Sequence, residues 1–220
     1  MSARLYLVRH AESTWNAAGR VQGQADPPLS ERGLVQAARL AERFRGEPID
    51  ALYSSPLERA RHTADRLAQA AALVTRIDDR LKEHDMGLFT GLVWREIVEQ
   101  FPEFSQAWME RAMDMPGGEK QAAFHMRATG VMQDIVARHP DGRIVVVSHG
   151  GILGRYLAHL LGLAPERPPP FRFDNASVSI VEVGGPLPVP RVHCLNDVSH
   201  LIAPSGNGRR STGDAGEGNR

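Results

Sequence analysis

Residues 5–16 of this chain read Leu5-Tyr6-Leu7-Val8-Arg9-His10-Ala11-Glu12-Ser13-Thr14-Trp15-Asn16, an apolar run that stops abruptly at an arginine and a histidine. The run from Leu5 to Val8 has the composition of a buried β-strand. In an open α/β sheet, ligands bind at the carboxyl ends of the strands. Arg9 and His10 are therefore placed for chemistry if the chain forms a sheet of this kind.

The composition limits the class of protein. A length of 220 residues fits one domain, and no internal linker rich in Pro, Gly or Ser divides it. Lys plus Arg and Asp plus Glu number 26 each, so no overall field attracts nucleic acid or an anionic membrane. The single cysteine, Cys194, excludes an intramolecular disulfide, and neither a secretion signal nor an apolar run of membrane-spanning length is present. We expect a cytoplasmic protein that binds neither nucleic acid nor membrane.

Strands and helices alternate along the rest of the chain. We expect strands at residues 5–8, 51–54, 74–77, 144–147, 178–183 and 189–195. Helices are expected at residues 30–44, 55–72, 94–111, from after the Pro116-Gly117-Gly118 turn to about 138, and at 152–161. Ser30 is the predicted N-cap of the first helix, and Ser55 with Pro56 is the predicted start of the second.

The run from Ile144 to Val147 shows no polar alternation, which is typical of a parallel strand covered by helices on both faces. The whole pattern predicts an α/β fold: a three-layer α/β/α sandwich with a mostly parallel central sheet and a small helical cap inserted after the third strand. Residues 1–202 form the predicted domain. Residues 203–220 are polar and Gly-rich, which predicts a disordered C-terminal tail.

Three further segments stand at predicted strand ends or in loops: Ser54-Ser55-Pro56-Leu57-Glu58-Arg59-Ala60-Arg61, Leu81-Lys82-Glu83 and Ser148-His149-Gly150-Gly151. Together with Arg9-His10, they resemble the histidine phosphatase superfamily, also called the phosphoglycerate mutase-like family, from about Arg4 to Asn196. The resemblance implies a phosphoric monoester hydrolase of the histidine acid type that works through a phosphohistidine.

The residue types suit phosphoryl transfer. A histidine is partly neutral at pH 7, and neighbouring arginines disfavour its protonated form, so His10 can act as a nucleophile. Arg9 and Arg59 can hold phosphoryl oxygens with their guanidinium forks. His149, if protonated, would add a further positive donor. Gly150 lies at a strand-to-helix turn, where backbone N–H groups can approach a phosphate closely.

Expelling an alcohol as an alkoxide is costly, so a general acid is needed near the leaving oxygen. Residues 81–91 resemble the family's loop that carries a glutamate before a Gly-aromatic-x-Gly stretch, which makes Glu83 the candidate acid. Thr90 stands where members commonly have Glu. Asp85 lies only two residues from Glu83 and remains the competing carboxylate, although we favour Glu83.

The resemblance also assigns Asn16 as a phosphate-contacting residue and Gln22-Gly23 to a loop that flanks the pocket, so these three are candidate substrate-binding residues with Gly150. For Glu119, a charge in the first turn of a helix and a catalytic role both remain open. The other histidines, including His62, His125, His139 and His159, lack the spacing of a metal site. We therefore expect no metal and no other cofactor.

Seven large apolar residues crowd the segment after Glu83: Trp94, Phe101, Phe104, Trp108, Met109, Met113 and Met115. They either pack a helical subdomain onto the core or form an apolar cap over the pocket, which would favour esters of hydrophobic alcohols and broad specificity.

Three functions remain: a phosphomonoesterase acting on small-molecule phosphate monoesters, a phosphoglycerate-type mutase, and a catalytically silent binding module. We prefer the phosphomonoesterase. Arg95 and Arg111 are the only arginines of the segment 83–115, which offers few cations to bind the second anionic group of a mutase substrate. Whether the chain forms a homodimer is open.

Overall fold

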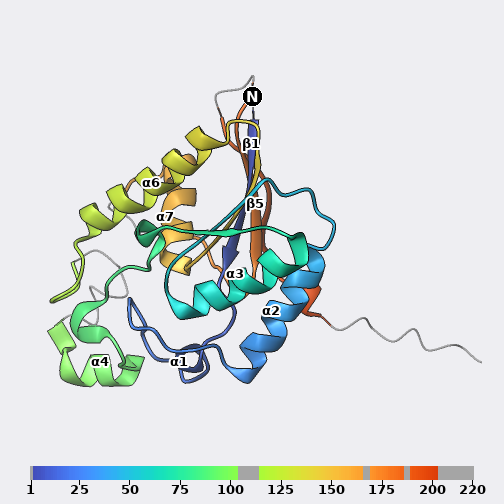
Figure 1. Cartoon of the computed structure of the whole chain (residues 1–220). Helices are drawn as coiled ribbons and strands as arrows, with labels where there is room; N and C mark the ends of the chain where they lie inside the picture. The colour runs from blue at the N-terminus through green and yellow to red at the C-terminus, as the bar shows by residue number, and fades with distance from the viewer. Residues whose placement is uncertain (1, 104–113, 166–168, 186–188, 203–220) are drawn as a thin grey trace, which may run out of the picture.

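The structure is a computed structural model that describes residues 2–103, 114–165, 169–185 and 189–202. Six strands form one sheet in the order β3-β2-β4-β1-β5-β6 (Figure 1). The strands are β1 Ser2–Arg9, β2 Ala51–Ser54, β3 Thr75–Ile77, β4 Arg143–Ser148, β5 Val178–Gly184 and β6 Arg191–Asp197. All six predicted strands are therefore present, and the predicted tail lies outside the described residues.

The sheet is mostly parallel, as predicted. Strands β3, β2, β4 and β1 run in one direction, and β5 pairs antiparallel with both β1 and β6. Arg9 pairs with Ser148 in the register between β1 and β4. Because the two strands are parallel neighbours in this register, the residues that follow them, His10 and His149, emerge at the same edge of the sheet.

Helices cover both faces of the sheet, which confirms the three-layer sandwich (Figure 1). The longer helices are α2 Glu31–Arg43, α3 Glu58–Ala71, α6 Gln121–Arg138 and α7 Gly150–Leu160. Leu5 and Leu7 of β1 pack in one buried cluster with residues of α6 and α7, whereas Tyr6 and Val8 pack in another with residues of α2 and α3. The pleat of the strand thus sends alternate side chains into two cores.

The short elements lie in the connections. They are α1 Thr14–Ala17, α4 Trp94–Gln100 and the 3-10 turns η1 Asp79–Leu81, η2 Gly87–Phe89 and η3 Ser199–Leu201. The predicted helix 94–111 is interrupted in the described part, because α4 ends at Gln100 and Phe101 leaves the helical conformation, while Pro102 and Glu103 are helical again. Phe101 packs instead with Phe89 and Ile97 in a small separate cluster.

One predicted helix start is confirmed and one is wrong. The Ser30 side chain accepts a hydrogen bond from the Gly33 amide and caps α2. Helix α3 begins at Glu58 instead of at Pro56, with Leu57 as its N-cap. Ser55 precedes the helix, and its hydroxyl contacts the His149 ring and the Leu57 amide instead of capping α3.

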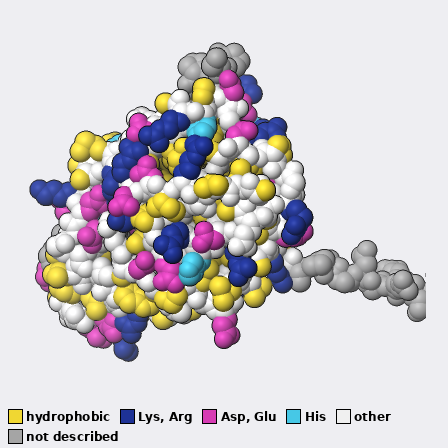
Figure 2. Space-filling model, viewed as in Figure 1, with side chains coloured by type: hydrophobic (Ala, Val, Ile, Leu, Met, Phe, Trp, Pro, Cys, Tyr) yellow, Lys and Arg dark blue, Asp and Glu magenta, His cyan; other side chains and the backbone are white. Residues whose placement is uncertain are grey.

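The face of the molecule drawn in Figure 2 carries no dominant charge. On the face shown in Figure 2, basic and acidic side chains are interspersed, in keeping with their equal numbers in the sequence. Within the described ranges, no helix is both long enough and apolar enough to span a membrane.

Candidate active site

His10 follows β1 directly and is 2% exposed. Its Nδ1 lies 2.7 Å from the carbonyl oxygen of Ala11. A carbonyl can only accept, so Nδ1 carries the hydrogen of the neutral ring and Nε2 keeps its lone pair. Burial, followed by the charges of Arg9 and Arg59, holds the pKa of His10 well below its usual value. His10 therefore presents an uncharged, nucleophilic nitrogen at neutral pH.

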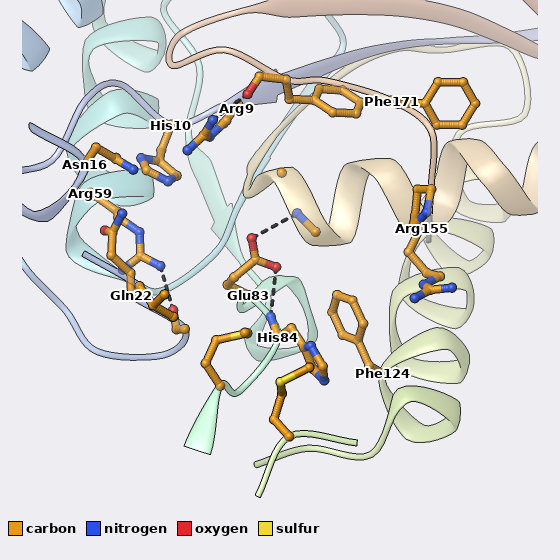
Figure 3. A pocket seen from close by; sticks show the side chains of 18 of the residues that line it. Arg9, His10, Asn16, Gln22, Arg59, Glu83, His84, Phe124, Arg155 and Phe171 are labelled. Carbon is orange, nitrogen blue, oxygen red and sulfur yellow. Dashed lines mark hydrogen bonds between the residues drawn. The ribbon is translucent and has the colours of Figure 1, made fainter. Parts of the chain in front are cut away.

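Arg59 and Arg9 converge on this ring from α3 and from the end of β1 (Figure 3). The Arg59 guanidinium donates to the carbonyls of Ala25 at 2.6 Å and Gly23 at 2.8 Å, and Arg9 donates to the Phe173 carbonyl. Burial lowers the pKa of both arginines, that of Arg59 to about 10, so both stay charged at neutral pH. These bonds leave donors on both guanidiniums for an anion.

His149 lies at the end of β4, with its ring centroid 5.1 Å from that of His10. Its side chain is fully buried, and its Nε2 lies 2.8 Å from the Ser55 hydroxyl. Burial first, and then the charge of Arg59, holds its pKa well below the usual value. Burial and the neighbouring arginines thus favour the neutral ring of His149 over the protonated one.

Glu83 reaches the pocket from the loop after η1. Its two carboxylate oxygens accept hydrogen bonds from the Gly151 amide at 2.9 Å and the His84 amide at 2.8 Å (Figure 3). A Cβ atom on Gly151 would stand 2.2 Å from a Glu83 oxygen, so only glycine allows this approach. The competing Asp85 does not line the pocket, and its carboxylate accepts from the Gly87 amide of its own turn.

Arg127 of α6 holds the loop that carries Glu83. Its guanidinium donates to the carbonyls of Arg80, Lys82 and Glu83 at 2.7 to 3.2 Å. The same guanidinium pairs with both carboxylate oxygens of Glu119. The structure therefore gives Glu119 a third role that the sequence analysis did not consider, as the counter-ion of a loop anchor.

Asn16, Gln22, Gly23 and Gly150, the four candidate substrate-binding residues, all line the pocket. Asn16 Oδ1 accepts from the Ser13 amide at 3.1 Å, and Gln22 Oε1 accepts from the Ser13 hydroxyl at 2.8 Å. Because both carboxamide oxygens are engaged, the two NH₂ groups remain to face the pocket. The carbonyl oxygen of Gly23 accepts a hydrogen bond from the Arg59 guanidinium.

The pocket has a volume of about 410 Å³ and two unlike ends. The polar end consists of Arg9, His10, Asn16, Gln22 and Arg59. The aromatic end consists of Met86, Met115, Phe124, Phe171 and Phe173, with Pro169 beside them. In Figure 3, Glu83 lies between the labelled residues of the polar end and Phe124 of the aromatic end.

Sequence reasoning found the polar end and missed most of the aromatic end. Of the seven apolar residues proposed as a cap, Met115 lines the pocket, Trp94 is 41% exposed and Phe101 packs elsewhere. The other four lie outside the described residues. Arg20, Arg155 and Arg172 also line the pocket and were missed, since none stands in a recognisable motif. Arg95, in contrast, is exposed and pairs with Glu99.

The donor groups of the pocket do not form a metal site: in the described part of the chain, no cluster of three or more His, Cys, Asp or Glu side chains is placed to hold an ion. The positive charge of the polar end comes from guanidinium groups.

A family model for the histidine phosphatase superfamily (branch 1) matches residues 5–197. The chain therefore belongs to the histidine phosphatase superfamily.

Its relatives include phosphatases and a mutase. The chain is 40% identical over 182 residues to phosphoserine phosphatase 1 of Hydrogenobacter thermophilus, covering 82% of this chain and 86% of that protein. It is 33% identical over 211 residues to the probable phosphoglycerate mutase GpmB of Cronobacter sakazakii, covering 92% of this chain and 96% of that one. A solved mycobacterial glucosyl-3-phosphoglycerate phosphatase is 31% identical, with a TM-score of 0.80 over 89% of this chain and 99% of that chain.

Proposed function

We propose that the protein is a phosphomonoesterase that hydrolyses small phosphate monoesters through a phosphohistidine at Nε2 of His10. The observation that carries this proposal is the His10 ring itself. It is buried, neutral and fixed by the Ala11 carbonyl so that one lone pair is left free between two guanidinium groups. This is the arrangement that an in-line attack on a phosphoryl group requires.

The first half of the reaction forms the phosphoenzyme. Arg9, Arg59 and the carboxamides of Asn16 and Gln22 hold the phosphoryl oxygens, and His10 Nε2 forms a bond to phosphorus as the ester P–O bond breaks. As general acid, the carboxyl group of Glu83 gives a proton to the leaving alcohol oxygen. Its backbone bonds from Gly151 and His84 orient the carboxyl group for this transfer.

The second half returns the enzyme to its starting state. The Glu83 carboxylate takes a proton from a water molecule, and the water oxygen bonds to phosphorus as the His10 Nε2–P bond breaks. Inorganic phosphate leaves, and the proton taken from water replaces the one that Glu83 gave to the alcohol, so both residues return to their starting states. Neither half requires a metal, because the guanidinium groups supply the positive charge.

The neutral state of His10 also supports the histidine acid type. Because its pKa lies well below the usual value, the nucleophile is not lost by protonation at mildly acidic pH. We further propose a cytoplasmic location, on the basis of the single cysteine, and a homodimer as the assembly to be tested by light scattering.

The aromatic end suits the alcohol part of the ester. Its apolar side chains would shield the carbon skeleton, and Arg155 with Gln121, hydrogen-bonded at 2.9 Å, forms a polar corner beside Phe124. Relatives named as phosphoserine phosphatase and glucosyl-3-phosphoglycerate phosphatase act, by their names, on small esters that carry a carboxylate. Esters of this kind are the first substrates to test.

The mutase remains the second candidate, because several relatives, 32 to 34% identical, are named probable phosphoglycerate mutase GpmB. The scarcity of cations in residues 83–115 no longer argues against it, since Arg20, Arg155 and Arg172 reach the pocket from other segments. The hydrolase is favoured because the chain is 40% identical to a phosphoserine phosphatase and 33% identical to a probable phosphoglycerate mutase.

A two-product assay tests the choice. The purified protein is given a panel of phosphate monoesters that includes phosphoserine and 3-phosphoglycerate, the latter with 2,3-bisphosphoglycerate present. We expect inorganic phosphate and little 2-phosphoglycerate. Interconversion of the two phosphoglycerates much faster than phosphate release would overturn the hydrolase proposal in favour of the mutase.

A further inference from the structure

The two buried histidines use opposite ring nitrogens for their contacts with the protein. His10 is held through Nδ1, by the Ala11 carbonyl. His149 is held through Nε2, by the Ser55 hydroxyl at 2.8 Å. Nδ1 of His149 is buried and has no hydrogen-bond partner among the described residues. It is therefore the only His149 nitrogen left to contact a phosphoryl group on His10.

The direction of the hydrogen bond between Ser55 and His149 determines whether Nδ1 of His149 carries a hydrogen or a lone pair. This hydroxyl accepts a hydrogen bond from the Leu57 amide at 3.3 Å, and the acceptor it meets in the described structure is Nε2 of His149. If Ser55 donates to Nε2, a neutral His149 ring must carry its own hydrogen on Nδ1. The low pKa of His149 agrees with a neutral ring.

We propose that Ser55 is a positioning residue that fixes neutral His149 as the Nδ1–H tautomer, so that Nδ1–H donates to a phosphoryl oxygen. This inference rests on the proposed function. In the other tautomer, the lone pair of Nδ1 would face the phosphoryl oxygens and repel them. The same tautomer thus serves both histidines: His10 offers a lone pair at Nε2, and His149 offers a hydrogen at Nδ1.

Histidine ¹⁵N NMR of the resting enzyme at about pH 7.5 tests the tautomer without substrate. The His149 signal is assigned by its loss in His149→Asn. We expect an Nδ1–H ring in the wild type and an altered tautomer balance in Ser55→Ala. Ser55→Thr, which keeps the hydroxyl, should restore the wild-type signal. An Nε2–H ring in the wild type, or an unchanged signal in Ser55→Ala, would overturn the inference.

Kinetics provide a second test that does not depend on how Ser55 variants fold. The amide nitrogen of Asn stands where Nδ1 stands in histidine, whereas that of Gln stands near Nε2. His149→Asn should therefore retain at least about tenfold more kcat than His149→Gln, and the reverse order would contradict the inference.

Ser55→Ala should lower kcat at least about tenfold, because the Nδ1–H form of His149 is then only partly populated, whereas loss of a direct donor costs about 10²–10³-fold. Ser54→Ala is the matched control. Ser54 is equally buried, but its hydroxyl donates to the Ser55 carbonyl at 2.9 Å, so we expect an unchanged His149 signal and a smaller loss of kcat. Equal losses in the two variants would contradict the role of Ser55. An Nδ1–H ring in an enzyme without phosphatase activity would support the tautomer and refute the proposed function instead.

Discussion

The two ends of the pocket differ in how the chain builds them. The polar end is assembled from residues that directly follow β1 or lie in short motifs, and its side chains are tied by hydrogen bonds to nearby backbone. The aromatic end is assembled from α6, from the loop that follows Glu83 and from residues 169–173, which meet only in the folded chain. The side chains of the first end are therefore held by hydrogen bonds, including those of Arg9 and Arg59 to carbonyls distant in the sequence, whereas those of the second are held by apolar packing. This difference predicts that mutations at the two ends separate chemistry from substrate choice.

Glu83, which lies between the two ends, should give the largest effect and should depend on the leaving group. Glu83→Gln should slow alkyl phosphates by about 10²–10⁴-fold, because a poor leaving group needs the proton. The same variant should lose much less on p-nitrophenyl phosphate, whose phenolate departs unprotonated. Steady-state kinetics on both esters measure the difference.

Asp85→Asn is the matched control, and it should change neither substrate by more than a few-fold because Asp85 bonds to its own turn. Gly151→Ala should also slow alkyl phosphates more than p-nitrophenyl phosphate, since the added Cβ would displace the Glu83 carboxylate. A leaving-group effect in Asp85→Asn and none in Glu83→Gln would reverse the assignment.

Arg59 should affect all esters alike, because it acts on the phosphoryl group that they share. Arg59→Met should lower kcat by about 10²–10³-fold and weaken inhibition by inorganic phosphate or vanadate. Arg61→Met, an exposed position on the same helix, provides the control. If the loss in Arg59→Met varied strongly among esters, Arg59 would belong to the recognition of the alcohol and not of the phosphate.

The aromatic end should control KM and the ranking of substrates. Phe171→Ala should change kcat/KM by about tenfold for esters with an apolar alcohol and much less for the smallest esters. Leu88→Ala removes an apolar side chain that is 58% exposed and outside the pocket, so it should leave the ranking unchanged. A uniform loss of kcat in Phe171→Ala would show that the two ends are not separable.

The buried histidines should also make stability depend on pH. In the unfolded chain they titrate near pH 6.5, whereas their folded pKa values lie well below that. As the pH falls through 6.5, the unfolded state binds protons that the folded state does not, so stability is lost on acidification. Each such histidine contributes a slope of up to about 1.4 kcal/mol per pH unit between its two pKa values.

Urea denaturation between about pH 7.5 and 5 measures this slope. His149→Asn should reduce it, and His62→Asn, at a partly exposed surface position, should leave it unchanged. A wild-type slope that His149→Asn does not alter would mean that His149 is protonated in the folded protein.

The same contrast explains which features the sequence could predict. His10 and His149 could be placed together because each follows an apolar run that predicts a parallel strand, and neighbouring strands end at one edge. Phe124 and Phe171 could not, because the direction in which a side chain of a helix or an irregular segment points depends on its packing. The start of α3 was misplaced for a similar reason: Ser55 has the sequence of a helix cap, but its hydroxyl bonds to a ring 94 residues away.

Trapping the phosphoenzyme tests the central claim most directly. A reaction with ³²P-labelled substrate is quenched within the first turnovers, and the label on the protein is followed in acid and in base, with and without EDTA in the reaction. We expect an acid-labile, base-stable label that forms in the presence of EDTA and is absent from His10→Ala. Label that persists in His10→Ala, or that forms only when a divalent ion is restored, would contradict the account.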